Sequence, residues 1–143
     1  MTDFVTFDIA KKLKEKGFRE ECFAYYTSEY TLYNNLVVLC DDKYLEVAEI
    51  DYTESLTSNN SVRENKYNNI CDAPTISQVL KWLREDKKLH INIEIMRTNK
   101  YCFDIYETHS CNFVFGFADN SLMTESYEEA ALAGIEYTID NLI

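Results

Sequence analysis

The residues best suited to chemistry are two cysteines and a histidine that lie close together in the sequence. Cys102, His109 and Cys111 carry the sulfur and imidazole ligands that Zn²⁺ prefers, and His90 lies on the neighbouring predicted strand. Zinc usually takes four ligands from closely spaced pairs, and the chain has no CxxC pair. Because Cys111 alternates with phenylalanines in a predicted strand, buried core cysteines are the better interpretation. We expect no bound metal.

The same residues can be arranged as a nucleophilic triad of Cys102 or Cys111 with His109 and Asp104. Such a site needs a nucleophile beside a histidine that an acid orients. No nucleophile elbow, glycine-rich loop or HExxH motif accompanies these residues, and the chain has three glycines in all. We therefore expect a protein that is not an enzyme and needs no cofactor. A small hydrolase or metal-binding protein using Cys102, His109 and Cys111 stays as an alternative.

The strongest bulk property is the negative charge, −11 overall, and no Lys or Arg occurs from Tyr101 to the end. Binding to a phosphate backbone depends on Lys and Arg, so we expect no direct binding of nucleic acid. The acids could instead imitate DNA and occupy a basic groove on a host nucleic-acid enzyme, which is a second hypothesis. The candidate interaction surface consists of Asp119, Glu125, Glu128, Glu129, Glu136 and Asp140.

Composition indicates a folded protein of the cytoplasm. The 143 residues suit one domain, and 46% of them are hydrophobic. The N-terminus lacks the apolar run of a signal peptide, and no stretch approaches the length of a membrane span, so we expect no membrane partner. The five cysteines are odd in number and widely spaced, which is typical of reduced thiols.

The clearest predicted element is a helix over residues 126–143. Ser126 and Glu129 have the spacing of a capping box, in which each side chain accepts a hydrogen bond from the other residue's amide. Gly134 is costly inside a helix, so its expected use is to bring the helix close to a sheet. One face is apolar and must be buried; it carries Ala131, Ile135, Thr138, Ile139 and Leu142.

A second helix and three strands precede this helix. Pro74, Thr75 and Gln78 predict a helix start, with an apolar stripe of Ile76, Val79, Leu80 and Leu83 and with Trp82 at its edge. Residues 89–96, 101–106 and 111–117 alternate as strands, the last with Cys111, Phe113, Phe115 and Phe117 on one side. The predicted fold is α+β, a two-layer arrangement with both helices on one face of an antiparallel sheet and the order α-β-β-β-α.

The N-terminal half predicts a helix over residues 8–16, capped by Asp8 and stopped by Gly17. Strands follow at 22–27, 30–39 and 44–50. Residues 51–71 are rich in Ser, Thr and Asn and predict a polar loop. We expect a single domain over 1–143, with the loop joining halves over 1–50 and 72–143.

Two resemblances add context to this fold. The order of the C-terminal elements resembles the double-stranded-RNA-binding domain in topology alone, because Glu128 and Glu129 stand where that family carries lysines. The stretches over 8–18, 73–85 and 126–143 resemble a group of small acidic proteins of gut bacteria and their phages. That likeness implies a phage or mobile-element context and no catalytic residues.

The sequence therefore predicts an accessory protein that acts by binding another protein. The identity of this protein partner is open. Eleven tyrosines could supply an aromatic contact surface, since tyrosine is favoured at interfaces. A homodimer formed through an exposed strand edge is a further alternative.

Overall fold

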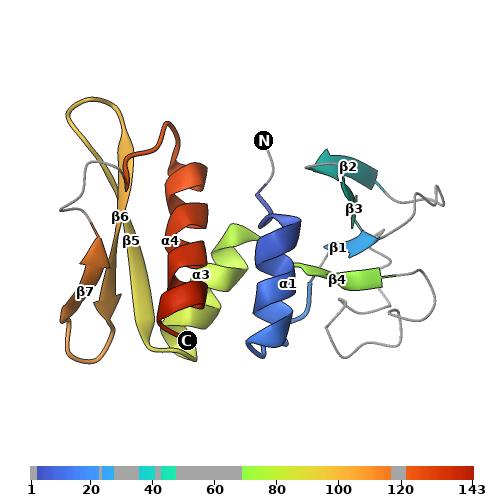
Figure 1. Cartoon of the computed structure of the whole chain (residues 1–143), viewed down its shortest axis with the longest axis horizontal. Coiled ribbons are helices and arrows are strands. Elements are labelled where there is room, and N and C mark those ends of the chain that lie inside the picture. The colour runs from blue at the N-terminus through green and yellow to red at the C-terminus, as the bar shows by residue number, and fades with distance from the viewer. Residues whose placement is uncertain (1–2, 23, 28–35, 41–42, 48–68, 117–121) are drawn as a thin grey trace. The chain divides into compact units, whose positions relative to one another are not determined.

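A computed structural model of the chain describes residues 3–22, 24–27, 36–40, 43–47, 69–116 and 122–143. At residues 25, 27, 36–40, 43–47, 69 and 70 it describes the backbone alone. The chain divides into two compact units, Met1–Thr75 and Ile76–Ile143 (Figure 1). The predicted polar loop lies within the first unit: residues 51–68 are outside the described residues, and 69–71 belong to a strand.

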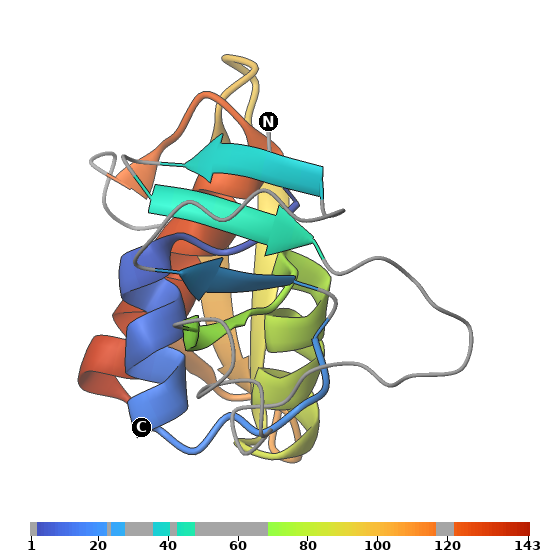
Figure 2. The ribbon, with the colours of Figure 1, turned by 90° about the vertical axis from the view of Figure 1, so that its right-hand side faces the viewer.

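The first unit consists of helix α1 (Phe7–Glu15) and an antiparallel sheet of strands β1 (Ala24–Thr27), β2 (Leu36–Cys40), β3 (Lys43–Val47) and β4 (Asn69–Ala73). The strands lie in the order β2-β3-β1-β4, which Figure 2 shows from top to bottom. Strand β1 is therefore internal, and β4, the last strand in sequence, is its neighbour.

Helix α1 packs by an apolar stripe in which Ile9, Ala10 and Leu13 are buried. Its N-cap is Thr6, whose hydroxyl oxygen accepts a hydrogen bond from the Ile9 amide at 3.4 Å. The prediction of Asp8 as the cap was wrong: Asp8 lies in the first turn, where the positive end of the helix favours an acid.

The buried Tyr26 joins the first sheet to the start of this helix. Its hydroxyl donates a hydrogen bond to the carbonyl of Val5 at 2.6 Å. Its ring meets Phe7 edge to face, with 5.4 Å between the ring centroids. Because the hydroxyl has a partner, the full ring can be buried without leaving a polar atom unsatisfied.

The second unit has the predicted order α-β-β-β-α, which confirms the α+β fold class. Helix α3 (Ile76–Glu85) is followed by β5 (Leu89–Ile95), β6 (Tyr101–Glu107), β7 (Phe113–Gly116) and α4 (Tyr127–Asn141). The strands form an antiparallel sheet in the order β5-β6-β7. Both helices lie on the same side of this sheet (Figure 1).

The predicted apolar stripe of α3 needs one correction. Ile76, Val79 and Leu83 are buried as expected, but Leu80 is only half-buried. Trp82, predicted at the edge of the stripe, is buried at 4% exposure, and the Lys87 ammonium lies 4.9 Å from its ring centroid. A large aromatic ring contributes more burial than a leucine, so the helix is turned to bury the tryptophan.

Helix α4 begins as predicted, at Ser126, and lies close to the sheet at Gly134. A β-carbon on Gly134 would lie 2.9 Å from the Cγ2 atom of Ile91 and 3.1 Å from the Phe103 ring. The absence of a side chain therefore lets the helix approach β5 and β6. The face around Gly134 is buried, including Ala131, Ile135 and Ile139.

Strand β7 departs from its predicted alternation because its pairing with β6 contains a bulge. Ile105 pairs with Phe115, whereas the next residue, Tyr106, pairs with Phe113. Because β7 has one extra residue at the bulge, the side chains that precede the bulge point to the opposite face of the sheet from the one that regular alternation predicts. The prediction that Cys111, Phe113 and Phe115 share one side was therefore wrong, and Phe117 lies outside the described residues.

The two phenylalanines of β7 accordingly have different surroundings. Phe115 stacks on Tyr137 of α4, with 3.7 Å between the ring centroids, and so faces the helices. Phe113 meets Tyr106 edge to face at 5.8 Å and is 55% exposed. The bulge thus places an aromatic side chain on the face of the sheet opposite the helices.

No helix within the described residues is both long enough and apolar enough to cross a lipid bilayer.

Candidate functional site

The structure does not bring Cys102 together with His109 and Cys111. Cys102 lies near the start of β6, where its thiol points to the carbonyl of Glu94 at 3.8 Å. His109 and Cys111 lie in the turn that follows the other end of this strand. Across the described part of the chain, no group of three His, Cys, Asp or Glu side chains is arranged to hold a metal ion.

Cys102 is also buried, with 1% of its surface exposed. Burial raises the pKa of this thiol, and the negative charges of Asp104 and Glu94 raise it further. A thiol with a raised pKa carries little of the thiolate that attacks a substrate. Cys102 therefore has the environment of a core cysteine, as predicted, whereas the same prediction was wrong for Cys111, which is exposed.

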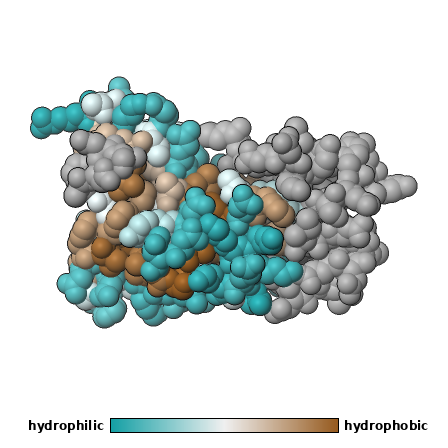
Figure 3. All heavy atoms as spheres, in the orientation of Figure 1, coloured by the Kyte–Doolittle hydropathy of each residue, from teal (hydrophilic) through white to brown (hydrophobic). Residues whose placement is uncertain are grey.

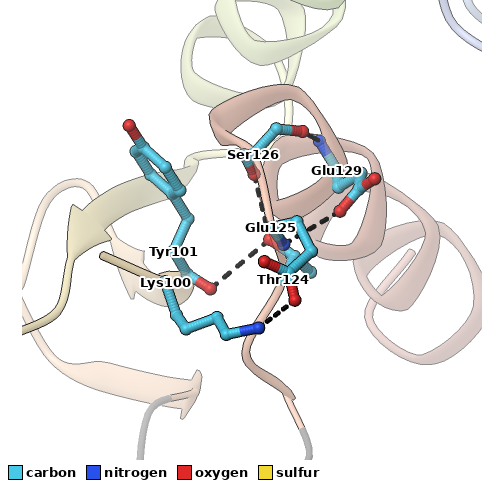
Figure 4. A network of polar contacts seen from close by, with 6 residues as sticks. All are labelled: Lys100, Tyr101, Thr124, Glu125, Ser126 and Glu129. Carbon is cyan, nitrogen blue, oxygen red and sulfur yellow. Dashed lines mark hydrogen bonds and ion pairs between the residues drawn. The ribbon is translucent and has the colours of Figure 1, made fainter. Parts of the chain in front are cut away.

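Three of the predicted surface acids lie at the start of α4, and Figure 4 shows two of them, Glu125 and Glu129. The Ser126 hydroxyl accepts a hydrogen bond from the Glu129 amide at 3.2 Å. The Glu129 carboxylate in turn accepts one from the Glu125 amide at 3.0 Å, one residue before the position that a capping box predicts. The Glu125 carboxylate pairs with the Lys100 ammonium. Glu125 and Glu129 thus stabilise the helix start, and Glu128 is half-buried.

The remaining predicted acids lie further along the helix. Glu129, Glu136 and Asp140 are exposed, and their spacing of seven and four residues places them on one face of α4. The last turn of α4 contains no basic residue. Asp119 lies outside the described residues.

A cavity of about 340 Å³ opens where α3, β5 and the turn between β6 and β7 meet. Its volume is within the range of pockets that bind small molecules or single anchoring side chains. No local motif marks it, because its lining comes from separate parts of the sequence. The lining residues are Arg84, His90, Tyr106, Glu107, Thr108 and Cys111.

An aromatic pair, the half-buried Tyr106 and the exposed Phe113, lies at this cavity. Tyr106 lines the cavity, pairs directly with His90 across the strands and contacts the exposed ring of Phe113. We call Phe113 together with the six lining residues the sheet-end site. In the space-filling view, apolar side chains gather where β7 and α4 lie, above hydrophilic side chains (Figure 3).

The turn at this site is fixed by its own hydrogen bonds. The Cys111 amide donates to the Glu107 carbonyl at 2.9 Å, and Cys111 has a positive φ of 57°. The Ser110 hydroxyl donates to the Glu107 carboxylate at 2.6 Å. The Thr108 amide donates to the Lys88 carbonyl at 2.9 Å, which ties the turn to the start of β5. The site is therefore built on ordered backbone.

Sequence reasoning considered His90 and Cys111 together as candidate metal ligands, but it did not associate either of them with Tyr106 or Arg84. Finding the site would have required the register of β5 on β6, in which His90 lies opposite Tyr106. That register depends on both strands and cannot be obtained from one of them alone. No family model matches the chain, and no curated protein or solved structure matches it either. The chemistry of the sheet-end site is thus the guide to function: two aromatic rings, both signs of charge and one thiol around a cavity.

Proposed function

We propose that this chain is a non-catalytic interaction protein that binds another protein through the sheet-end site. The observation that carries the proposal is the 55% exposure of Phe113 beside a cavity of about 340 Å³. Exposed aromatic side chains next to a concave surface are typical of protein interfaces, where Tyr and Arg contribute much of the binding energy. Tyr106 and Arg84 supply both residue types here.

The shape of the site indicates the kind of partner. The face of the sheet that carries Phe113 and Tyr106 is opposite the face that contacts α4. A partner can therefore cover Phe113 and place one apolar side chain in the cavity. Arg84 and Glu107 at the cavity offer a cation and an anion to polar groups around that anchor.

The test uses Phe113→Ser as the site variant and Ile95→Ser as its matched control. Both residues are large, apolar and exposed, at 55% and 62%, but Ile95 lies at the opposite end of the sheet. A partner identified by affinity capture from the native host should bind the Phe113→Ser variant at least about tenfold more weakly, as at an interface hot spot. The Ile95→Ser variant should bind like the wild type.

Equal binding of the partner to wild type and to Phe113→Ser would contradict the use of this site. Circular dichroism of both variants shows that each is folded. If affinity capture recovers only further copies of this chain, and the chain sediments as a dimer, the homodimer alternative is favoured instead.

A second candidate function is imitation of DNA by the acids of α4. It is favoured by the single face that presents Glu129, Glu136 and Asp140, on a helix with no basic residue in its last turn. Binding to a basic groove would weaken steeply with salt and would be competed by duplex DNA. Triple replacement of these acids by their amides should abolish such binding, whereas Phe113→Ser should leave it unchanged.

The biological setting proposed for either function is the cytoplasm of a bacterial host, with the chain supplied by a phage or mobile element. Cys22, Cys71, Cys102 and Cys111 form no disulfide bond in the structure, which is consistent with a reducing compartment. The resemblance to small acidic proteins of gut bacteria and their phages supports the origin.

A further inference from the structure

Cys111 differs from the other cysteines that the structure describes. Cys22, Cys71 and Cys102 are buried, with at most 1% of each exposed, whereas Cys111 is exposed. Cys111 also lines the cavity of the sheet-end site. Among these four thiols, Cys111 is therefore the one that a dissolved reagent reaches most easily, and it lies in the lining of a cavity.

The pKa values of two buried thiols strengthen this contrast. Burial raises the pKa of Cys22, and the nearby Asp72 carboxylate raises it further. Burial likewise raises the pKa of Cys102. Thiol exchange needs both access and thiolate, so these two cysteines are protected on both counts.

The charges at the cavity indicate which small molecules would fit. Arg84 brings a guanidinium group, which binds carboxylates through two parallel hydrogen bonds. Glu107 brings a carboxylate, which binds ammonium groups. A ligand with one carboxylate and one ammonium group is complementary to this pair, and amino acids and short peptides carry both groups.

The turn holds the thiol in place for such a ligand. The Cys111 amide donates to the carbonyl of Glu107, so the backbone of the thiol-bearing residue is tied to the residue that carries the anion. The Glu107 carboxylate is itself held by the Ser110 hydroxyl at 2.6 Å. These bonds keep the backbones of Cys111 and Glu107 close together and hold the Glu107 carboxylate beside the cavity.

We propose that Cys111 is a modification site that undergoes thiol–disulfide exchange with small zwitterionic disulfides of the amino-acid or short-peptide type. The Cys111 thiolate attacks one sulfur of the ligand, the ligand's disulfide bond breaks, and a new disulfide bond joins Cys111 to half of the ligand. The other half leaves as a thiolate and takes up a proton from water. The ligand is the oxidant, and it is reduced as the Cys111 sulfur is oxidised.

Glutathione disulfide is the probe for the test, with the full chain as the protein. Peptide mapping by mass spectrometry should place an adduct on Cys111 and none on Cys22, Cys71 or Cys102. The Arg84→Gln variant should react about fivefold more slowly, as expected for loss of one exposed carboxylate contact. Arg97→Gln is the matched control, because Arg97 is an exposed arginine outside the cavity lining, and it should react at the wild-type rate.

An uncharged disulfide, 2,2′-dithiodipyridine, separates recognition from simple access. Its reaction with Cys111 should be equally fast in wild type and in Arg84→Gln. An adduct on Cys22, Cys71 or Cys102 in place of Cys111, or equal slowing of both probes by Arg84→Gln, would overturn the proposal. Cys111→Ser removes the adduct site, and circular dichroism shows that this variant is folded. The readout needs no protein partner, so it is independent of the proposed binding function.

Discussion

The buried Cys22 thiol lies near a buried carboxylate, that of Asp72, whose negative charge affects the pKa of the thiol. The Cys22 side chain is fully buried, and its thiol donates to the carbonyl of Glu20 at 3.4 Å. Asp72 on β4 is 1% exposed. The pKa of the Cys22 thiol is raised above its ordinary value of 9.0, first by burial and then by the negative charge of Asp72.

This raised pKa predicts that the protein loses stability in alkali. Well below pH 9.0 the Cys22 thiol is protonated in both the folded and the unfolded chain. Its full contribution to the free energy of unfolding is then present. As the pH rises further, the unfolded thiol loses its proton while the folded one keeps it. The free energy of unfolding then falls, by at most about 1.4 kcal/mol per pH unit for one group.

Urea unfolding at about pH 8 and about pH 10 measures this loss. The Cys22→Ala variant should lose less stability across the interval than the wild type, although it is less stable at both pH values. Parallel losses in the two proteins would show that Cys22 does not carry the effect.

Buried acidic residues were the hardest single residues to predict, because acidic side chains ordinarily lie on the surface. Asp72 and Asp104 are carboxylates with at most 5% exposure, and nothing in the local sequence distinguishes them from solvated acids. Asp104 lies beside Gly116, where an added β-carbon would clash with the Oδ1 atom of Asp104. That relation depends on the pairing of two strands and has no sequence signal.

Among the elements, α4 allows a direct test of close packing. Gly134→Val would place methyl groups against Ile91 and Phe103, where even a β-carbon lies only 2.9 Å from the Ile91 methyl. We expect a loss of about 2 to 3 kcal/mol in the free energy of unfolding, typical of overpacking. Urea unfolding followed by circular dichroism provides the measurement.

Ala133→Val is the matched control for this change. Ala133 precedes Gly134 in the same helix and is only half-buried. Its replacement should cost less than about 1 kcal/mol, mainly in helix propensity. Similar losses at both positions would mean that close approach to the sheet is not the reason for the glycine.

Elements defined by local chemistry were predicted well. The start of α4 at Ser126 and the role of Gly134 follow from neighbouring residues, and both are confirmed. The side of β7 on which Phe113 lies was not predicted. A bulge is a relation between two strands, so the sequence of one strand does not reveal it.

For the whole molecule, the net charge of −11 predicts that salt stabilises the fold. Repulsion among excess negative charges favours the expanded chain, and dissolved ions screen that repulsion. The free energy of unfolding should rise by about 1 kcal/mol between about 20 and about 200 mM sodium chloride. Urea unfolding at both concentrations measures the change, and a fall would show that attractive ion pairs dominate.

The arrangement within the first unit shows the limit of prediction at this scale. Its strand order β2-β3-β1-β4 places β4 beside β1, although more than forty residues separate them in the sequence. The second sheet has the sequential order β5-β6-β7, and its three antiparallel strands between two helices were predicted. Local hairpins can be read along a chain, whereas pairing across a long segment is decided by the packing of the whole unit.

Trp82, the only tryptophan of the chain, is buried in α3 and therefore belongs to the second unit alone. Its fluorescence, excited at wavelengths that tyrosine does not absorb, is an optical label for that unit. Far-ultraviolet circular dichroism reports on the backbone of both units together. Agreement of the two signals during denaturation would indicate one cooperative transition, and a difference would resolve the second unit's unfolding from the first unit's.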